Sequence, residues 1–91
     1  MTFNARKTLS LGTVSVIGSV QAGSGSLVHM AGGTITNSIL FAAVANIGSL
    51  VVPAGTGAVA GVIMIEATFG PAGTLGAKEV LIDEVVLMKM A

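Results

Sequence analysis

TLSLGTVSVIGSV, residues 8–20, alternates small polar and apolar side chains with the two-residue period of a half-buried β-strand. Leu9 and Leu11 would lie on one face, and Val14 and Val16 follow after a one-residue slip at Gly12. A β-bulge produces such a slip, and glycine is its usual occupant. The stretch therefore predicts a strand with a bulge at Gly12.

Glycine-rich segments divide the rest of the chain into short apolar runs, which favours further strands. AGSG at residues 22–25 predicts a loop, and Gly32-Gly33 predicts a two-residue hairpin turn. The composition of residues 54–57 and 70–73 predicts two more turns. The further strands are expected at residues 26–30, 49–52, 58–69 and 79–90.

Residues 35–47, ITNSILFAAVANI, are compatible with two structures. Asn37 or Ser38 could cap a short buried helix, at about residues 37–47, that ends before Gly48. The same run could be a strand that is buried on both faces, because periodicity does not separate the two in a short apolar segment. The strand is slightly favoured, since the neighbouring segments have strand patterns.

Short strands at this spacing predict an all-β fold, as a small glycine-rich sandwich of jelly-roll type or a barrel. No linker, second domain or convincing internal repeat interrupts the chain. Residues 1–91 are therefore expected to form a single β domain, with residues 1–8 as a candidate N-terminal arm.

The composition excludes several classes of protein. The 91 residues include no Cys, Trp or Tyr, and they carry four Lys/Arg against four Asp/Glu. No disulfide scaffold or Cys-based metal site can form. A net charge of zero argues against a nucleic-acid partner, because binding to phosphates requires a basic surface. Intrinsic disorder is also disfavoured, because 53% of the residues are hydrophobic.

The hydrophobic content is high for the surface of a soluble monomer. Between Lys7 and Glu66 the chain contains no Asp, Glu, Lys or Arg. A monomer of this mass would expose roughly 4,800 Å², and the few polar side chains could not prevent large apolar patches on that surface. Other copies, a larger assembly or lipid must therefore cover part of it.

Contacts with other protein chains are favoured over lipid as what covers the apolar surface. Gly57-x-x-x-Gly61 matches a close-packing motif of membrane helices, but a spanning helix needs about twenty mostly apolar residues. Residues 35–52 contain several polar residues and are closed by Pro53, and residues 58–65 are too short. A small membrane protein that resembles the holins is the main alternative.

No residue pattern predicts catalysis, a cofactor or a metal site, and we expect a protein that is not an enzyme. His29 is the single histidine, and no Asp or Glu lies near it in the sequence. Gly55-x-Gly57-x-x-Ala60 matches a dinucleotide fingerprint, but Gly61 and the β-branched residues after it are a poor start for the helix that this motif requires.

Two resemblances extend these expectations. LIDEVVL, residues 81–87, resembles the closing strand of jelly-roll carbohydrate-binding modules, which makes such a module a second alternative. A sugar platform uses aromatic faces, however, and the chain has only Phe3, Phe41 and Phe69. By composition and size, the chain resembles small structural proteins of phage particles, of the capsid decoration, cement or fibre-base type. This resemblance implies a virion location, or otherwise a cytoplasmically assembled particle.

The expected partners are copies of the chain, as a trimer or larger homo-oligomer, and other structural proteins of the same particle. Charged residues at the two ends are the candidates for polar interface contacts. Glu79 and Asp83 would share one face of the last strand, with Glu84 on the other. The candidate interface residues are Arg6, Lys7, Glu79, Asp83, Glu84 and Lys89.

Overall fold

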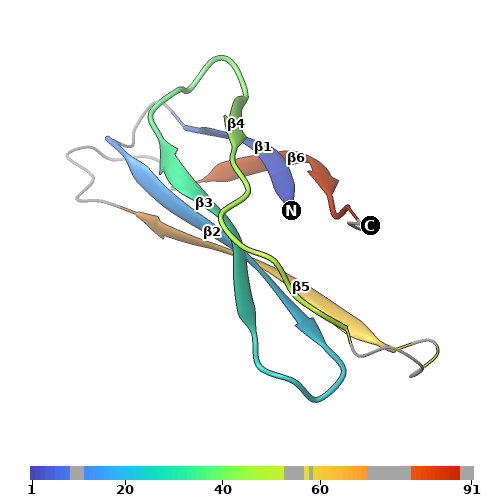
Figure 1. Cartoon of the computed structure of the whole chain (residues 1–91). Coiled ribbons are helices and arrows are strands. Elements are labelled where there is room, and N and C mark those ends of the chain that lie inside the picture. Colours follow the sequence, from blue (N-terminus) through green and yellow to red (C-terminus); the bar gives the residue numbers. More distant parts are fainter. Residues whose placement is uncertain (9–11, 53–56, 58, 70–78, 89–91) are drawn as a thin grey trace.

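The computed structural model describes residues 1–8, 12–52, 57, 59–69 and 79–88, and in this part the chain is all-β, as expected. The strands form two antiparallel sheets of three, in the orders β4-β1-β6 and β3-β2-β5 (Figure 1). The described residues contain no helix, so the alternative of a helix at about 37–47 is wrong. The strands are β1 (Thr2–Lys7), β2 (Val14–Ala22), β3 (Val28–Ile35), β4 (Ala42–Val44), β5 (Gly61–Phe69) and β6 (Val80–Val86).

β2 is the centre of one sheet and carries the predicted alternation. Val14, Val16 and Val20 are buried, and β2 pairs with β3 on one side and with β5 on the other. Gly12, however, lies before the strand and is not a bulge within it. The one-residue slip in the pattern falls where the chain passes from β1 to β2, and Leu9 and Leu11 are outside the described residues.

β1 is the centre of the other sheet, between β4 and β6. Its buried residues are Phe3, Ala5 and Lys7, and the buried Met1 continues this alternation just before the strand. Met1, Phe3 and Ala5 belong to the hydrophobic core. Residues 1–8 thus do not extend from the domain as an arm, because β1 is hydrogen-bonded on both edges and contributes one face to the core.

The two sheets pack face to face around Gly18 of β2. A Cβ atom at Gly18 would lie 2.8 Å from Cε of Met1 and 2.9 Å from Cε1 of Phe3. The absence of a side chain at this position therefore lets the side chains of Met1 and Phe3 pack directly on β2, and the fully buried ring of Phe3 fills the space between the sheets.

The segment from Ile35 to Gly48 leaves the sheet of β3, adds β4 to the other sheet, and returns to the edge of β3. The side-chain Oδ1 of Asn37 accepts hydrogen bonds from the N–H groups of Ile39 (3.0 Å) and Leu40 (2.9 Å), which makes a turn in place of a helix cap. After β4, the N–H of Ile47 donates to the C=O of Met30 (2.8 Å), on the outer edge of β3. The expected strand with two buried faces is therefore replaced by the short β4, whose Ala43 is exposed, and by this edge pairing.

Of the predictions made for two glycine-rich segments, one is confirmed by the structure and the other is wrong. The loop at residues 22–25 is confirmed: the N–H of Gly25 donates to the C=O of Ala22 (3.0 Å), and Gly23 has a φ of +57°. The hairpin turn expected at Gly32 and Gly33 is wrong, because both residues lie inside β3, opposite Ile17 and Val16.

The two last strands agree with the sequence more closely. β5 and β6 lie within the runs expected at residues 58–69 and 79–90. Residues 49–52, in contrast, form no strand, and the turns expected at residues 54–57 and 70–73 lie almost entirely outside the described residues.

Candidate interaction surface

β5 is an edge strand whose free edge pairs with no other strand in the part of the chain that the structure describes. Its nine residues pair with β2 in an unbroken register, from Phe69 opposite Val14 to Gly61 opposite Ala22. Apolar side chains are exposed on both faces of this strand. The large ones are Val62, Ile63, Met64 and Phe69.

The devices that normally prevent edge-to-edge pairing are scarce in β5. Such strands are usually short, bulged, or interrupted by Pro or Lys. β5 is nine residues long and regular, contains neither Pro nor Lys, and has Glu66 as its one charged residue. An exposed, apolar and regular edge is a template for pairing with another chain.

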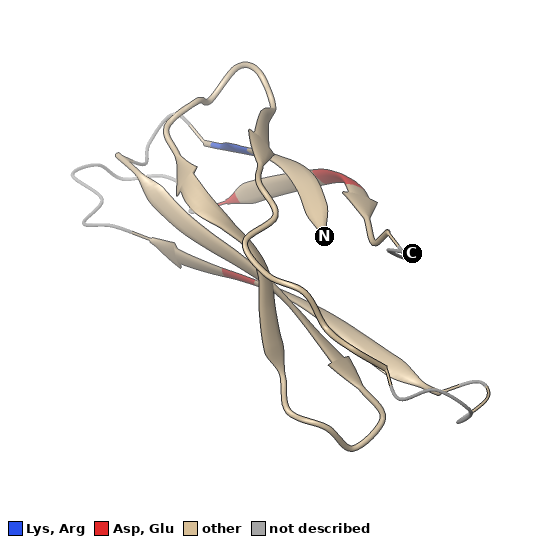
Figure 2. Ribbon diagram, viewed as in Figure 1, with Lys and Arg blue, Asp and Glu red and all other residues tan. Residues whose placement is uncertain are grey.

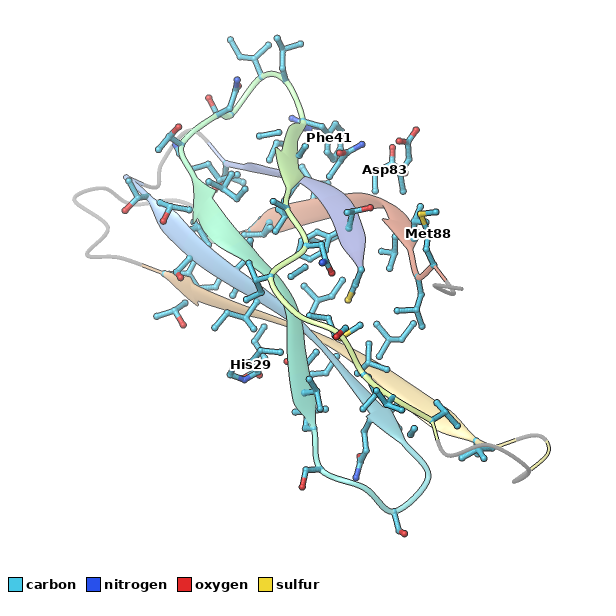
Figure 3. All side chains as sticks on the ribbon, in the orientation of Figure 1. His29, Phe41, Asp83 and Met88 are labelled. Atoms are coloured by element: carbon cyan, nitrogen blue, oxygen red, sulfur yellow. The ribbon has the colours of Figure 1, made fainter. Side chains whose placement is uncertain are left out.

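A second apolar surface is a groove between the two sheets, with a volume of ≈ 940 Å³. One wall comes from the sheet of β2 and β5, another from residues 48–52, and a third from residues 86–88 at the end of β6. Met88, labelled in Figure 3, is 76% exposed at its rim, and Val51 is 85% exposed. Apolar side chains predominate in the lining, which includes Met1, Val20, Met30, Leu50, Val51, Val52, Val59, Val86, Leu87 and Met88.

The loop before β4 is a third apolar site. Ile39 and Leu40 are 79% and 68% exposed. Phe41 lies beside them, and the guanidinium carbon of Arg6 is 5.3 Å from the centre of its ring, within the range of a cation–π contact. Nη1 of Arg6 also donates to the C=O of Ser38 at 3.3 Å. Arg6 of β1 therefore contacts this loop at both Ser38 and Phe41.

Three of the expected interface residues lie on the outer face of the β4-β1-β6 sheet. These three are Arg6 of β1 and Asp83 and Glu84 of β6. Asn4 of β1 lies on the same face, opposite Asp83. The side chain of Asn4 donates through Nδ2 to Oε2 of Glu84 at 3.0 Å. Figure 2 shows the positive residues at one end of β1 and the negative residues farther along the neighbouring β6, while most of the other ribbon is uncharged.

The remaining expected interface residues are elsewhere. Lys7 is buried at the end of β1, on the inner face, and its backbone N–H donates to the C=O of Asn37 (3.0 Å). Glu79 precedes β6, and its C=O accepts from the N–H of Thr8 (3.1 Å). Lys89 lies outside the described residues. The structure thus places Arg6, Asp83 and Glu84 on one sheet face without Lys7.

Glu84 forms a bulge in β6. Between the pairs Thr2–Val86 and Asn4–Asp83, β6 advances by three residues while β1 advances by two. Glu84 has a φ of +50°, in the left-handed region, and its N–H donates to Oδ1 of Asp83 (2.9 Å). The bulge ends the alternation of the last strand, so Glu84 does not simply face away from Asp83 as the sequence pattern predicts.

This geometry gives a stability prediction. Glu84→Val should lower the free energy of unfolding by about 1–2 kcal/mol, because a β-branched residue is strained at positive φ. Glu84→Gly should be close to neutral, since glycine relieves this strain while an exposed hydrogen bond to Asn4 is lost. Urea unfolding followed by far-UV circular dichroism measures both, and equal stability of the two variants would contradict the bulge.

His29 and Ser19 are the pair to consider for nucleophilic chemistry, since they are register partners on β3 and β2. His29 is exposed, and Figure 3 shows it on the far side of the molecule from Asp83 and Phe41. The hydroxyl of Ser19 is buried and has no hydrogen-bond partner among the described residues, so solvent and substrate do not reach it.

The described residues contain no metal site, no membrane-spanning helix and no helix after the dinucleotide-like motif. No group of three or more His, Cys, Asp or Glu side chains in this part of the chain could hold a metal ion. No helix there is long and apolar enough to cross a membrane. Gly57, Val59 and Ala60 of the dinucleotide-like motif are described and lead directly into β5, where that motif would require a helix.

Comparison with known proteins gave no match to a family model, to a curated protein or to a solved structure.

Proposed function

We propose that this chain is a non-enzymatic structural subunit that assembles with copies of itself through apolar β surfaces. The observation that carries the proposal is the clustering of exposed apolar side chains along β5 and around the groove. Single exposed apolar residues are normal in soluble proteins, whereas contiguous apolar patches mark interaction sites.

The total surface supports the same proposal. The chain has an accessible surface of 5958 Å² and extents of 52 × 22 × 17 Å. A folded monomer of its mass would expose roughly 4,800 Å². The excess is surface that contacts with other copies would cover, and burial of its apolar part favours association.

Two distinct surfaces allow an assembly larger than a dimer. The groove shares only Gly61 with β5, and its other described lining residues, including residues 86–88, lie outside that strand. A chain with two different contacts builds closed rings or extended lattices. We place this assembly in a particle of three or more copies, together with other structural proteins, and its setting as a virion decoration or cement protein rests on composition and size.

A charged residue in the groove tests this proposal. Leu87→Glu and Val51→Glu should each shift the sedimentation distribution towards smaller species, because an interface that covers the groove would have to bury an unpaired carboxylate. The matched control is Thr34→Glu, which adds the same charge to an exposed position on β3.

Analytical ultracentrifugation of the purified variants at equal concentration gives the readout. The proposal predicts at least a tenfold weaker association (about 1.4 kcal/mol) for the groove variants and little change for Thr34→Glu. Identical distributions for all three variants and the unaltered chain would rule out the groove as an assembly surface.

A further inference from the structure

The free edge of β5 has a geometry that fits one partner, a second copy of the same strand. Every residue from Gly61 to Phe69 pairs with β2 on one side. Because backbone groups alternate in direction along a strand, the remaining N–H and C=O groups point away from β2. Within the described residues no segment receives them.

We propose that β5 pairs antiparallel with β5 of a second copy, about a two-fold axis at Ile65. Ile65 is the middle residue of the strand, so this register uses its full length. The two sheets then become one continuous sheet in the order β3-β2-β5-β5-β2-β3, and about eight new backbone hydrogen bonds form. The inference rests on the proposed assembly function and names the contact.

The charge on β5 disfavours the register in which the axis lies at Glu66. With the axis at Ile65, Glu66 lies opposite Met64 of the second copy. With the axis moved to Glu66, two carboxylates lie directly opposite each other, which is unfavourable. A slip by a single residue would place the inner face of one copy beside the outer face of the other.

Side-chain sizes also match across the pair. On the inner face, Phe69 lies opposite Gly61 of the second copy and Ile63 lies opposite Ala67, so a large residue meets a small one in these pairs, while Ile65 meets Ile65 at the axis. An aromatic side chain opposite a glycine covers the exposed backbone of that glycine. The exposed Ile63 and Phe69 are therefore both covered on pairing.

Cysteine cross-linking tests the register directly, because the natural chain contains no cysteine. In the double variant Met64→Cys/Glu66→Cys, the thiol introduced at position 64 of each copy would face the thiol introduced at position 66 of the other. Their Cα separation would be one that a disulfide allows. Mild oxidation should convert at least half of the protein to a reducible dimer. Each single variant is a matched control, because the two thiols of its dimer lie on different rungs of the ladder.

Charge variants give a second measurement that does not depend on oxidation. Met64→Lys places a cation opposite Glu66 of the second copy, and Met64→Glu places a carboxylate there. Both remove the same exposed methionine side chain. Two such pairs form per dimer, so Met64→Lys should associate about tenfold more tightly than Met64→Glu, and the difference should shrink in high salt.

The outcomes separate this inference from the proposed function. Cross-linking of the double variant but not of the single variants, with the expected order of the charge variants, supports the β5 pair. An oligomeric chain in which the double variant does not cross-link, or cross-links no better than the single variants, overturns the β5 pair and leaves the assembly function standing. Association that is equal for Met64→Lys and Met64→Glu also overturns it. If the unaltered chain is a monomer, both the β5 pair and the proposed assembly function are wrong.

Discussion

Phe3→Ala should lower the free energy of unfolding by about 3–5 kcal/mol, as expected for a large aromatic residue removed from a packed core. Phe3 is 1% exposed and lies between the sheets, on the central strand β1. Since small domains are stable by about 5–15 kcal/mol, this loss removes much of the stability of a 91-residue chain.

Phe41→Ala is the matched control for this variant. Phe41 is 42% exposed, and its contact with Arg6 contributes about 0.5–1 kcal/mol. Urea unfolding at a fixed protein concentration compares the two, with far-UV circular dichroism as the probe because the chain has no Trp or Tyr. A small effect of Phe3→Ala, similar to that of Phe41→Ala, would mean that residues 1–8 are an arm after all.

Gly48→Ala should lower the free energy of unfolding by about 3 kcal/mol, at the upper end of the cost of overpacking. A Cβ atom at Gly48 would lie 2.5 Å from the backbone oxygen of His29 in β3. A backbone atom cannot rotate away as the end of a side chain can. The segment at residues 45–48 would have to move off β3, which would break the hydrogen bond from Ile47 to Met30.

Gly12→Ala is the control for the loss of a glycine. A Cβ atom at Gly12 has no neighbour within 4 Å. We expect no loss, or a gain of about 0.4–1 kcal/mol through lower entropy of the unfolded chain. Thermal unfolding of both variants provides the comparison, and a Gly48→Ala protein as stable as Gly12→Ala would show that residues 45–48 do not pack along β3.

The fold is predictable wherever a local pattern decides it. The alternation in β2 and the apolar runs that become β5 and β6 are properties of neighbouring residues, and so is the loop at residues 22–25. Gly32 and Gly33 predict a turn because glycine favours turns, but β3 continues through them, paired with β2. The backbone conformation at Gly32 and Gly33 is set by pairing with β2, whose residues lie far away in the sequence. A local pattern carries no information about this pairing.

Contacts between residues far apart in the sequence also explain why parts of the interaction surface are not predictable from it. Arg6, Asp83 and Glu84 can be selected from the sequence because charges are rare in it. The groove depends on the return of the chain from β4 to the edge of β3 and on the position of residues 48–52 after it, which no local pattern encodes. The apolar residues on both faces of β5 are visible in the sequence, and they are the signal that could have indicated an edge covered by another chain.

The native mass of the unaltered chain, measured without detergent over a range of concentrations, tests the central claim most directly. Native mass spectrometry and light scattering both give this quantity. We predict a stable, β-rich assembly of three or more copies of the 8.9 kDa chain. A monodisperse monomer of 8.9 kDa at all concentrations would contradict the account.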